Sequence, residues 1–192
     1  MVLSTLLGVP VAFAITRYRI PAKGFLNALI LASLITPPII KALSIYLFYV
    51  PFGLVNTKLG LACAHTVSGL PFVVINVAAS LRSYDVTLEH AAVIHGARPL
   101  ESILRITLPI ISPGIMVGAI FAFMQSAQEL LVSIFVMGTV SKPLAVKLWE
   151  GVQVAVDPTI AAASTGMIGL AVLAFICATL LRLRGHSVRG AT

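Results

Sequence analysis

A polar stripe interrupts one of the most apolar stretches of this chain. Gln125, Gln128, Glu129 and Ser133 occupy helical positions i, i+3, i+4 and i+8, so an α-helix would place them on one face. A carboxylate surrounded by lipid is costly, and Glu129 is therefore expected to face the protein interior or a water-filled path. Two interpretations remain open. Glu129 could be protonated and donate an interhelical hydrogen bond, or Gln125, Gln128 and Glu129 could line a path for a solute.

Three more polar side chains lie in apolar stretches. Lys41 comes shortly after the Pro37-Pro38 pair, and its long side chain is expected to reach the outer membrane interface rather than the path. His65 and Asn76 are expected to form hydrogen bonds between helices rather than to bind a ligand.

No motif for metal, nucleotide or covalent chemistry stands out. His90 and His95 are five residues apart, whereas a helical metal pair is spaced i, i+4, so no metal site is predicted. The sequence lacks a glycine-rich loop followed by Lys and Ser/Thr, and the chain is not expected to bind ATP or another cofactor. We do not predict an enzyme. A membrane-embedded enzyme whose catalytic residues meet only in space remains an alternative.

The composition indicates an integral membrane protein. Hydrophobic residues make up 59% of the 192 residues, charged residues only 10%, and the mean hydropathy is +1.06. The net charge of +7 is attributed to loop residues that set membrane orientation, not to nucleic-acid binding. Cys63 and Cys177 fall inside predicted spans, and no disulfide is expected.

Five apolar stretches are long enough, or nearly so, to cross a membrane. The first is short, but arginines follow it and none precedes it, which is the reverse of a signal peptide. Gly114, Gly118, Ala122 and Ser126 recur every four residues in the fourth stretch, which predicts close approach of another helix. The predicted spans are residues 2–16, 25–50, 59–81, 114–137 and 159–181, with Asp157 as the expected N-cap of the last.

The distribution of positive charge predicts the orientation. The first interspan loop, the 82–113 loop and the C-terminal tail carry nine Lys and Arg residues, against four on the other side. Because cytoplasmic loops are enriched in Lys and Arg, the N-terminus is expected outside, and the C-terminus and the 82–113 loop in the cytoplasm.

The 82–113 loop itself contains a helical pattern. Residues 87–95 have one apolar helical face, and Gly96 is placed to end that helix with a positive φ. Pro99 suits the first turn of a second helix, which Pro109 and Pro113 are expected to end. Such a pair of helices could dock on a partner, lie on the membrane surface or form a structured loop.

The same stretch resembles the EAA loop of ABC-importer membrane subunits. That motif reads Glu-Ala-Ala, three residues, Gly, nine residues and Ile-x-Leu-Pro, and the spacing here is the same. His90 stands where the motif has its glutamate, and Glu89 precedes it. The other residues that correspond to the motif are Ala91, Ala92, Gly96, Ile106, Leu108 and Pro109.

The resemblance implies the fold and the partners. It implies a single all-α membrane domain, residues 1–192, with the five-transmembrane-helix permease core of the MetI-like fold and a cytoplasmic coupling helix. A separate ATPase would bind ATP, an identical or related second permease subunit would complete the path, and a substrate-binding protein would act outside the inner membrane. Residues 8–19 resemble the second span and the following loop of six-span subunits. The chain could therefore be a five-span member or an inactive fragment.

The solute is suggested by the last third of the chain. Residues 123–129, 143–149 and 157–162 resemble spermidine/putrescine-type permeases, which often carry two acids where this chain has Gln128 and Glu129. We expect polyamine import, with Glu129 as a transient counter-charge. Opines, phosphonates and ferric iron are alternative solutes, and an ion-coupled secondary transporter is an alternative class.

Overall fold

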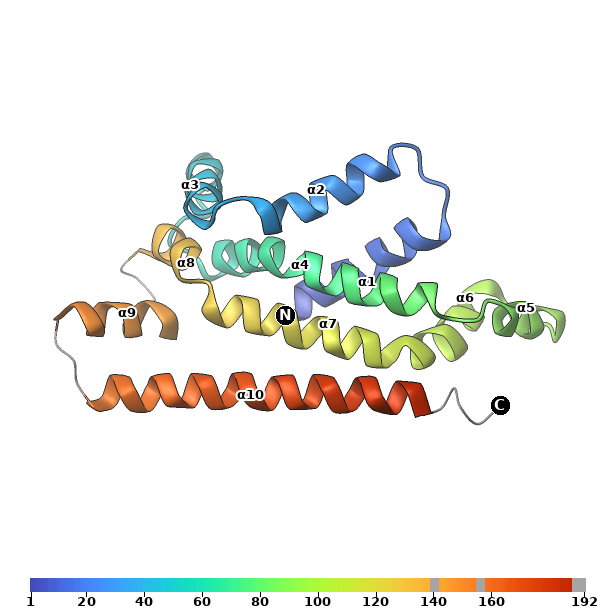
Figure 1. Ribbon diagram of the computed structural model, residues 1–192. Coiled ribbons are helices and arrows are strands. Elements are labelled where there is room, and N and C mark those ends of the chain that lie inside the picture. Colours follow the sequence, from blue (N-terminus) through green and yellow to red (C-terminus); the bar gives the residue numbers. More distant parts are fainter. Residues whose placement is uncertain (139–141, 155–157, 188–192) are drawn as a thin grey trace.

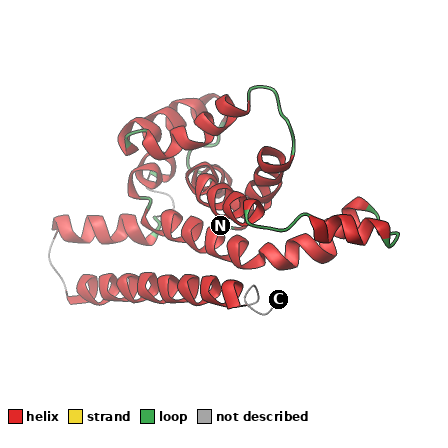
Figure 2. Ribbon diagram, turned by 45° about the vertical axis from the view of Figure 1, so that its right-hand side comes forward, coloured by secondary structure: helices red, strands yellow, loops and turns green. Residues whose placement is uncertain are grey.

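The protein is helical throughout the part that the structure describes. The computed structural model describes residues 1–138, 142–154 and 158–187, and these ranges contain helices, turns and loops without a strand (Figures 1 and 2). The expected all-α membrane fold is confirmed.

Three helices form the centre of the molecule. α1 (Val2–Arg17) and α7 (Leu108–Gln128) both pack along α4 (Lys58–Arg82), around buried residues that include Val73 and Ile111. A Cβ at Gly118 would lie 3.0 Å from the Val73 Cα, so α7 approaches α4 closely at this glycine. The small residues spaced four apart in α7 thus allow the close approach of another helix, as predicted.

The expected span 25–50 is sharply bent. α2 (Lys23–Ile35) and α3 (Pro38–Tyr49) meet at 109°, and a short 3₁₀ turn (Val50–Phe52) follows. A proline pushes the residue before it out of the helical region, and Thr36 and Pro37 have ψ angles of 128° and 135°. Three described helices are long enough to cross a membrane, and this bent pair is a fourth if it counts as one span. α1 is apolar but shorter.

The expected helix ends at Pro109 and Pro113 are wrong. Helical backbone runs from α6 (Pro99–Ser102) through a π turn (Ile103–Thr107) into α7. In the π turn the Leu108 N–H bonds to the carbonyl five residues back, which reduces the clash of the Pro109 ring with the preceding turn. Pro113 leaves the Pro109 carbonyl without its helical donor, and the Ser112 hydroxyl donates to that oxygen at 2.7 Å.

The expected span 114–137 contains a break. α7 ends at Gln128, Glu129 has non-helical angles (φ −75°, ψ 89°), and α8 (Leu130–Met137) continues at a different angle. α8 packs against α3 around Ala42 and Val132.

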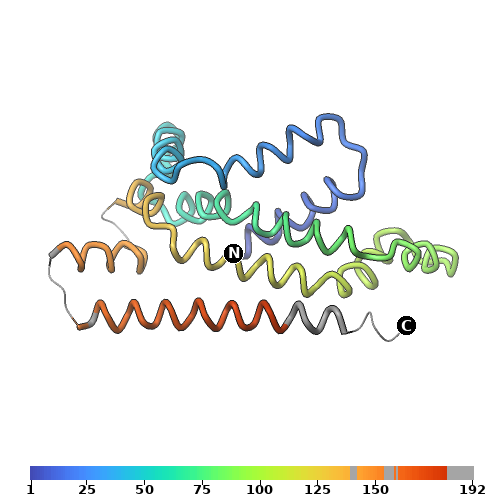
Figure 3. The backbone as a smooth tube through the Cα atoms, in the orientation of Figure 1, coloured from blue at the N-terminus to red at the C-terminus, as the bar shows by residue number. Residues whose placement is uncertain are grey.

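The last two helices lie at the side of this bundle. α9 (Leu144–Val154) contacts α8, and α10 (Pro158–Ser187) runs antiparallel beside α7 (Figures 1 and 3). The predicted N-cap Asp157 lies outside the described residues. α5 (Thr87–Ile94) and α6 project at one end of the molecule, where α4 ends and α7 begins (Figure 1).

Candidate functional site

The loop between α4 and α7 forms two short helices around a glycine. The Asp85 carboxylate accepts a hydrogen bond from the Thr87 N–H at 2.9 Å, which satisfies a free donor in the first turn of α5 and lowers the pKa of Asp85. Gly96 has a φ of +90°, in the region that favours glycine. The predicted helix end with a positive φ at Gly96 is therefore confirmed.

The projecting loop exposes a set of large apolar side chains. Ile94 is 83% exposed, and four others in α5, α6 and the π turn are 45% to 67% exposed. We call this set the loop face, meaning the exposed apolar side chains of the projection rather than one side of a helix: Leu88, Val93, Ile94, Leu100 and Leu104. Exposed apolar residues gathered on one projection are typical of a surface that contacts a partner.

Glu89 connects this loop to two other helices. Its Oε1 accepts from Arg17 Nη2 of α1 at 2.8 Å and from the Thr107 hydroxyl of the π turn, and both charged side chains are 19% exposed. The Arg17 guanidinium also lies 5.2 Å from the Tyr84 ring centroid, in a cation–π contact. We call Arg17, Tyr84, Glu89 and Thr107 the Glu89 cluster.

The remaining motif residues divide between exposed and partly buried positions. Ala92, Ile106 and Leu108 are partly buried, and Leu108 packs against the central core. The exposed members are His90, Ala91, Gly96 and Pro109. In the sequence, Arg17 is interpreted only as one of the positive charges that set the membrane orientation, and Thr107 is given no role. No local pattern relates either residue to Glu89.

A second polar cluster lies where the two broken spans meet. Lys41 Nζ is 3.0 Å from Glu129 Oε2, and the two side chains are only 11% and 4% exposed. Gln125 Nε2 donates to the same oxygen at 3.1 Å. The expected interfacial position of Lys41 is wrong, because α3 packs against α8 and the Lys41 ammonium group is buried against Glu129 at the start of α8.

His65 of α4 joins the same region. Its Nδ1 is 2.6 Å from the Ser126 hydroxyl, and its Nε2 is 3.2 Å from the Ser133 hydroxyl, so the ring contacts both sides of the break at Glu129. His65 is thus an interhelical hydrogen-bond partner, as expected. We call the whole set the Glu129 cluster: Lys41, His65, Gln125, Ser126, Glu129 and Ser133.

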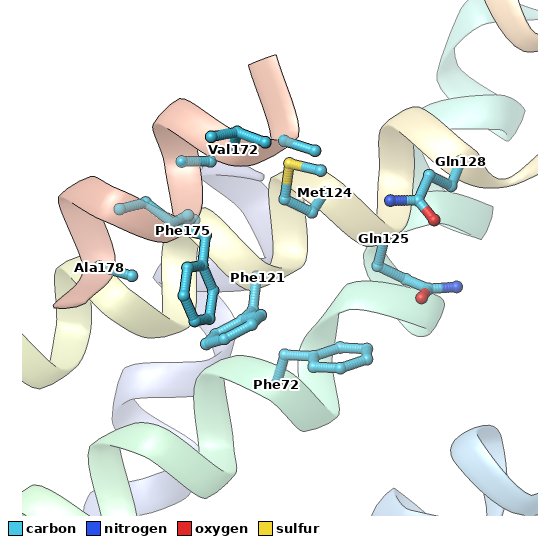
Figure 4. A pocket seen from close by; sticks show the side chains of 11 residues that line it. Phe72, Phe121, Met124, Gln125, Gln128, Val172, Phe175 and Ala178 are labelled. Carbon is cyan, nitrogen blue, oxygen red and sulfur yellow. The ribbon is translucent and has the colours of Figure 1, made fainter. Parts of the chain in front are cut away.

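A pocket of about 480 Å³ opens beside this cluster, between α4, α7 and α10. Figure 4 shows three phenyl rings at one end, those of Phe72, Phe121 and Phe175, and the amides of Gln125 and Gln128 at the other. Two of the three predicted path residues therefore line one cavity. Glu129 is not in the pocket wall. Gln125, which lines the pocket, donates a hydrogen bond to the Glu129 carboxylate. Among the described residues, no group of three His, Cys, Asp or Glu side chains could hold a metal ion.

The known proteins described here as similar to this chain are all components of transport systems. Residues 4–186 match the family described as binding-protein-dependent transport system inner membrane component. The spermidine/putrescine transport system permease protein PotC of Escherichia coli (strain K12) is 30% identical over 178 residues, 93% of this chain and 67% of the relative. The putrescine transport system permease protein PotI of the same strain is 28% identical over 193 residues, 97% and 69% of the two chains. The molybdenum transport system permease protein ModB of Mycobacterium bovis is 32% identical over 140 residues, 67% and 53% of the two chains.

Proposed function

Because this chain belongs to the family of binding-protein-dependent transport system inner membrane components, we propose that it translocates polyamines as a permease subunit of an ABC importer. The observation that carries the choice of solute is the buried carboxylate of Glu129 beside an aromatic and amide pocket. A carboxylate attracts a cation strongly where the surroundings are poor in water. The relatives named for spermidine and putrescine support the same solute.

The family and the exposed loop face support a proposal for the partners. We propose that the loop face docks on a cytoplasmic ATPase, which binds ATP, and that a substrate-binding protein delivers the solute from outside. A second permease subunit, identical or related, would complete the path. ATP binding would draw two ATPase subunits together and move the docked α5 of each permease.

The Glu89 cluster offers a route for that movement into the membrane. A displacement of α5 would act on α1 through Arg17 and on α7 through Thr107, because Glu89 contacts both. His90, at the glutamate position of the motif, is exposed and does not replace Glu89 in these contacts. We propose that Glu89 connects the docked loop to the spans, and that His90 faces the ATPase.

Uptake by cells that express the complete transporter tests the solute. We expect radiolabelled putrescine or spermidine to accumulate with the wild-type permease and to fall at least tenfold with Glu129→Gln, at equal membrane expression. Unchanged uptake by the variant would remove Glu129 from the path. No polyamine uptake by wild type would contradict the proposed solute, and parallel assays with molybdate, an opine, a phosphonate and ferric iron would identify a replacement.

Cysteine labelling tests the proposed orientation, with the N-terminus outside and the C-terminus in the cytoplasm. After Cys63 and Cys177 are replaced by alanine, Leu144→Cys on α9 should react with a membrane-impermeant thiol reagent added outside. Ser187→Cys should react only after the membrane is permeabilised. The opposite pattern would overturn the orientation and with it the docking of the loop face on a cytoplasmic partner.

A further inference from the structure

Stabilisation of the fold does not by itself explain why the chain has a buried Lys41–Glu129 ion pair. Both charges are removed from water, and a buried ion pair is often no more stabilising than apolar residues of similar volume. Lys41 also lies in the first turn of α3, where the helix dipole disfavours a positive charge. Both residues adjoin a break in a span, and they are 88 positions apart in sequence.

The chemistry of the lysine side chain suggests another reason. Lysine ends in a primary ammonium group on a flexible four-carbon stem, which resembles one half of an alkyl diamine such as putrescine. We propose that Lys41 is an internal substitute for the substrate ammonium group: it occupies the Glu129 carboxylate in the resting permease and is displaced when the ammonium group of a polyamine arrives. This inference rests on the proposed polyamine import and identifies the site that recognises the substrate.

The adjoining pocket provides the rest of such a site. Its volume of about 480 Å³ is within the usual range for small-molecule sites. The rings of Phe72 and Phe121, whose centroids are 6.5 Å apart, offer apolar surface to a methylene chain and π-faces to a second ammonium group. Gln125 belongs both to the pocket wall and to the Glu129 contacts, so an ammonium group that enters beside Gln125 is next to the carboxylate.

Exchange of one ammonium group for another also suits transport. Glu129 keeps a counter-charge throughout, so the incoming cation does not have to meet an unpaired buried carboxylate. The displaced Lys41 remains nearby and repels the bound substrate. Binding is therefore weak enough for release, which conduction through a membrane requires.

Binding to the purified transporter complex tests the exchange. The complex, assembled with its ATPase and second permease subunit, is titrated with n-butylammonium and with putrescine, and binding is followed by calorimetry. Lys41→Met removes the competing ammonium group and keeps an unbranched side chain of similar volume, so we expect both ligands to bind at least tenfold more tightly than to wild type. Lys147→Met, the same change at an exposed lysine of α9, should leave the affinity unchanged.

The double variant Lys41→Met with Glu129→Gln separates recognition from folding. It removes both charges of the buried pair, so a pair with a purely structural role could be replaced without loss of transport. We expect the double variant to co-purify with the ATPase, to bind neither ligand and to lose polyamine uptake at least tenfold. The proposed exchange would be contradicted if the double variant took up polyamine like wild type, or if Lys41→Met bound the two ligands no more tightly. Neither result would contradict polyamine import. If wild type takes up no polyamine but Lys41→Met gains affinity for butylammonium, the proposed solute fails and the ammonium site remains.

Discussion

Gly96→Asp should reduce co-purification of the ATPase at least tenfold while the permease still inserts into the membrane. Gly96 has a φ of +90°, and a residue with a Cβ adopts left-handed backbone at a cost of about 1–2 kcal/mol. The new carboxylate would also lie two residues after the C-terminal end of α5, where the helix dipole disfavours negative charge. Burial of that charge against a partner would weaken docking further.

Two other substitutions at position 96 separate charge from backbone strain. Asparagine has nearly the size of aspartate and tolerates a positive φ comparatively well, so Gly96→Asn should retain most of the bound ATPase. Gly96→Val adds no charge but places a β-branched residue where φ is positive, and it should lose most of the bound ATPase. The measurement is the ratio of ATPase to permease after affinity purification. Wild-type ratios for both the aspartate and the valine variants would contradict a docking role for this turn.

Glu89→Ala should uncouple ATP hydrolysis from transport. The substitution leaves the partly buried Arg17 without its carboxylate partner, and such a loss costs about 1–3 kcal/mol. Glu89 contacts the permease spans and does not belong to the loop face, so docking should persist. We expect ATPase co-purification to be retained, whereas uptake per ATP hydrolysed, measured in proteoliposomes with the substrate-loaded binding protein, should fall at least fivefold.

The same loop offers a matched control for Glu89. Glu101 pairs with Arg105 at 3.1 Å, but those side chains are 40% and 78% exposed. Exposed pairs contribute little to stability, so Glu101→Ala should leave the coupling ratio unchanged. The reversed pair, Arg17→Glu with Glu89→Arg, should recover part of the lost coupling. Equal coupling ratios for Glu89→Ala and wild type would show that movement of α5 reaches the spans by another route.

Much of the fold could be predicted because its signals are local. The apolar runs and the low content of charge predicted an all-helical membrane protein, and the small residues of α7 predicted its close approach to α4. The turn at Gly96 was predictable for the same reason, because the φ that only glycine adopts easily is a property of one residue and its neighbours.

Two of the missed features depend on neighbouring residues that the apolar pattern does not reveal, and a third depends on how distant helices pack. Pro113 ends a helix unless the freed carbonyl finds a donor, and here Ser112 provides one. Pro109 follows a π turn that the pattern of apolar residues did not reveal. The proline pair at residues 37 and 38 interrupts the span between 25 and 50, but only the fold sets the angle of 109° between α2 and α3 and brings Lys41 to Glu129.

The sequence by itself determined that this chain is a helical membrane protein, which segments are apolar, and where the EAA-like loop lies. Only the tertiary structure decided which charges meet. Arg17 and Glu89 are 72 positions apart, and Lys41 and Glu129 are 88 apart. Helical periodicity relates residues within a few turns of one another, whereas pairing across such separations depends on how α1, α3, α5 and the α7–α8 break pack together.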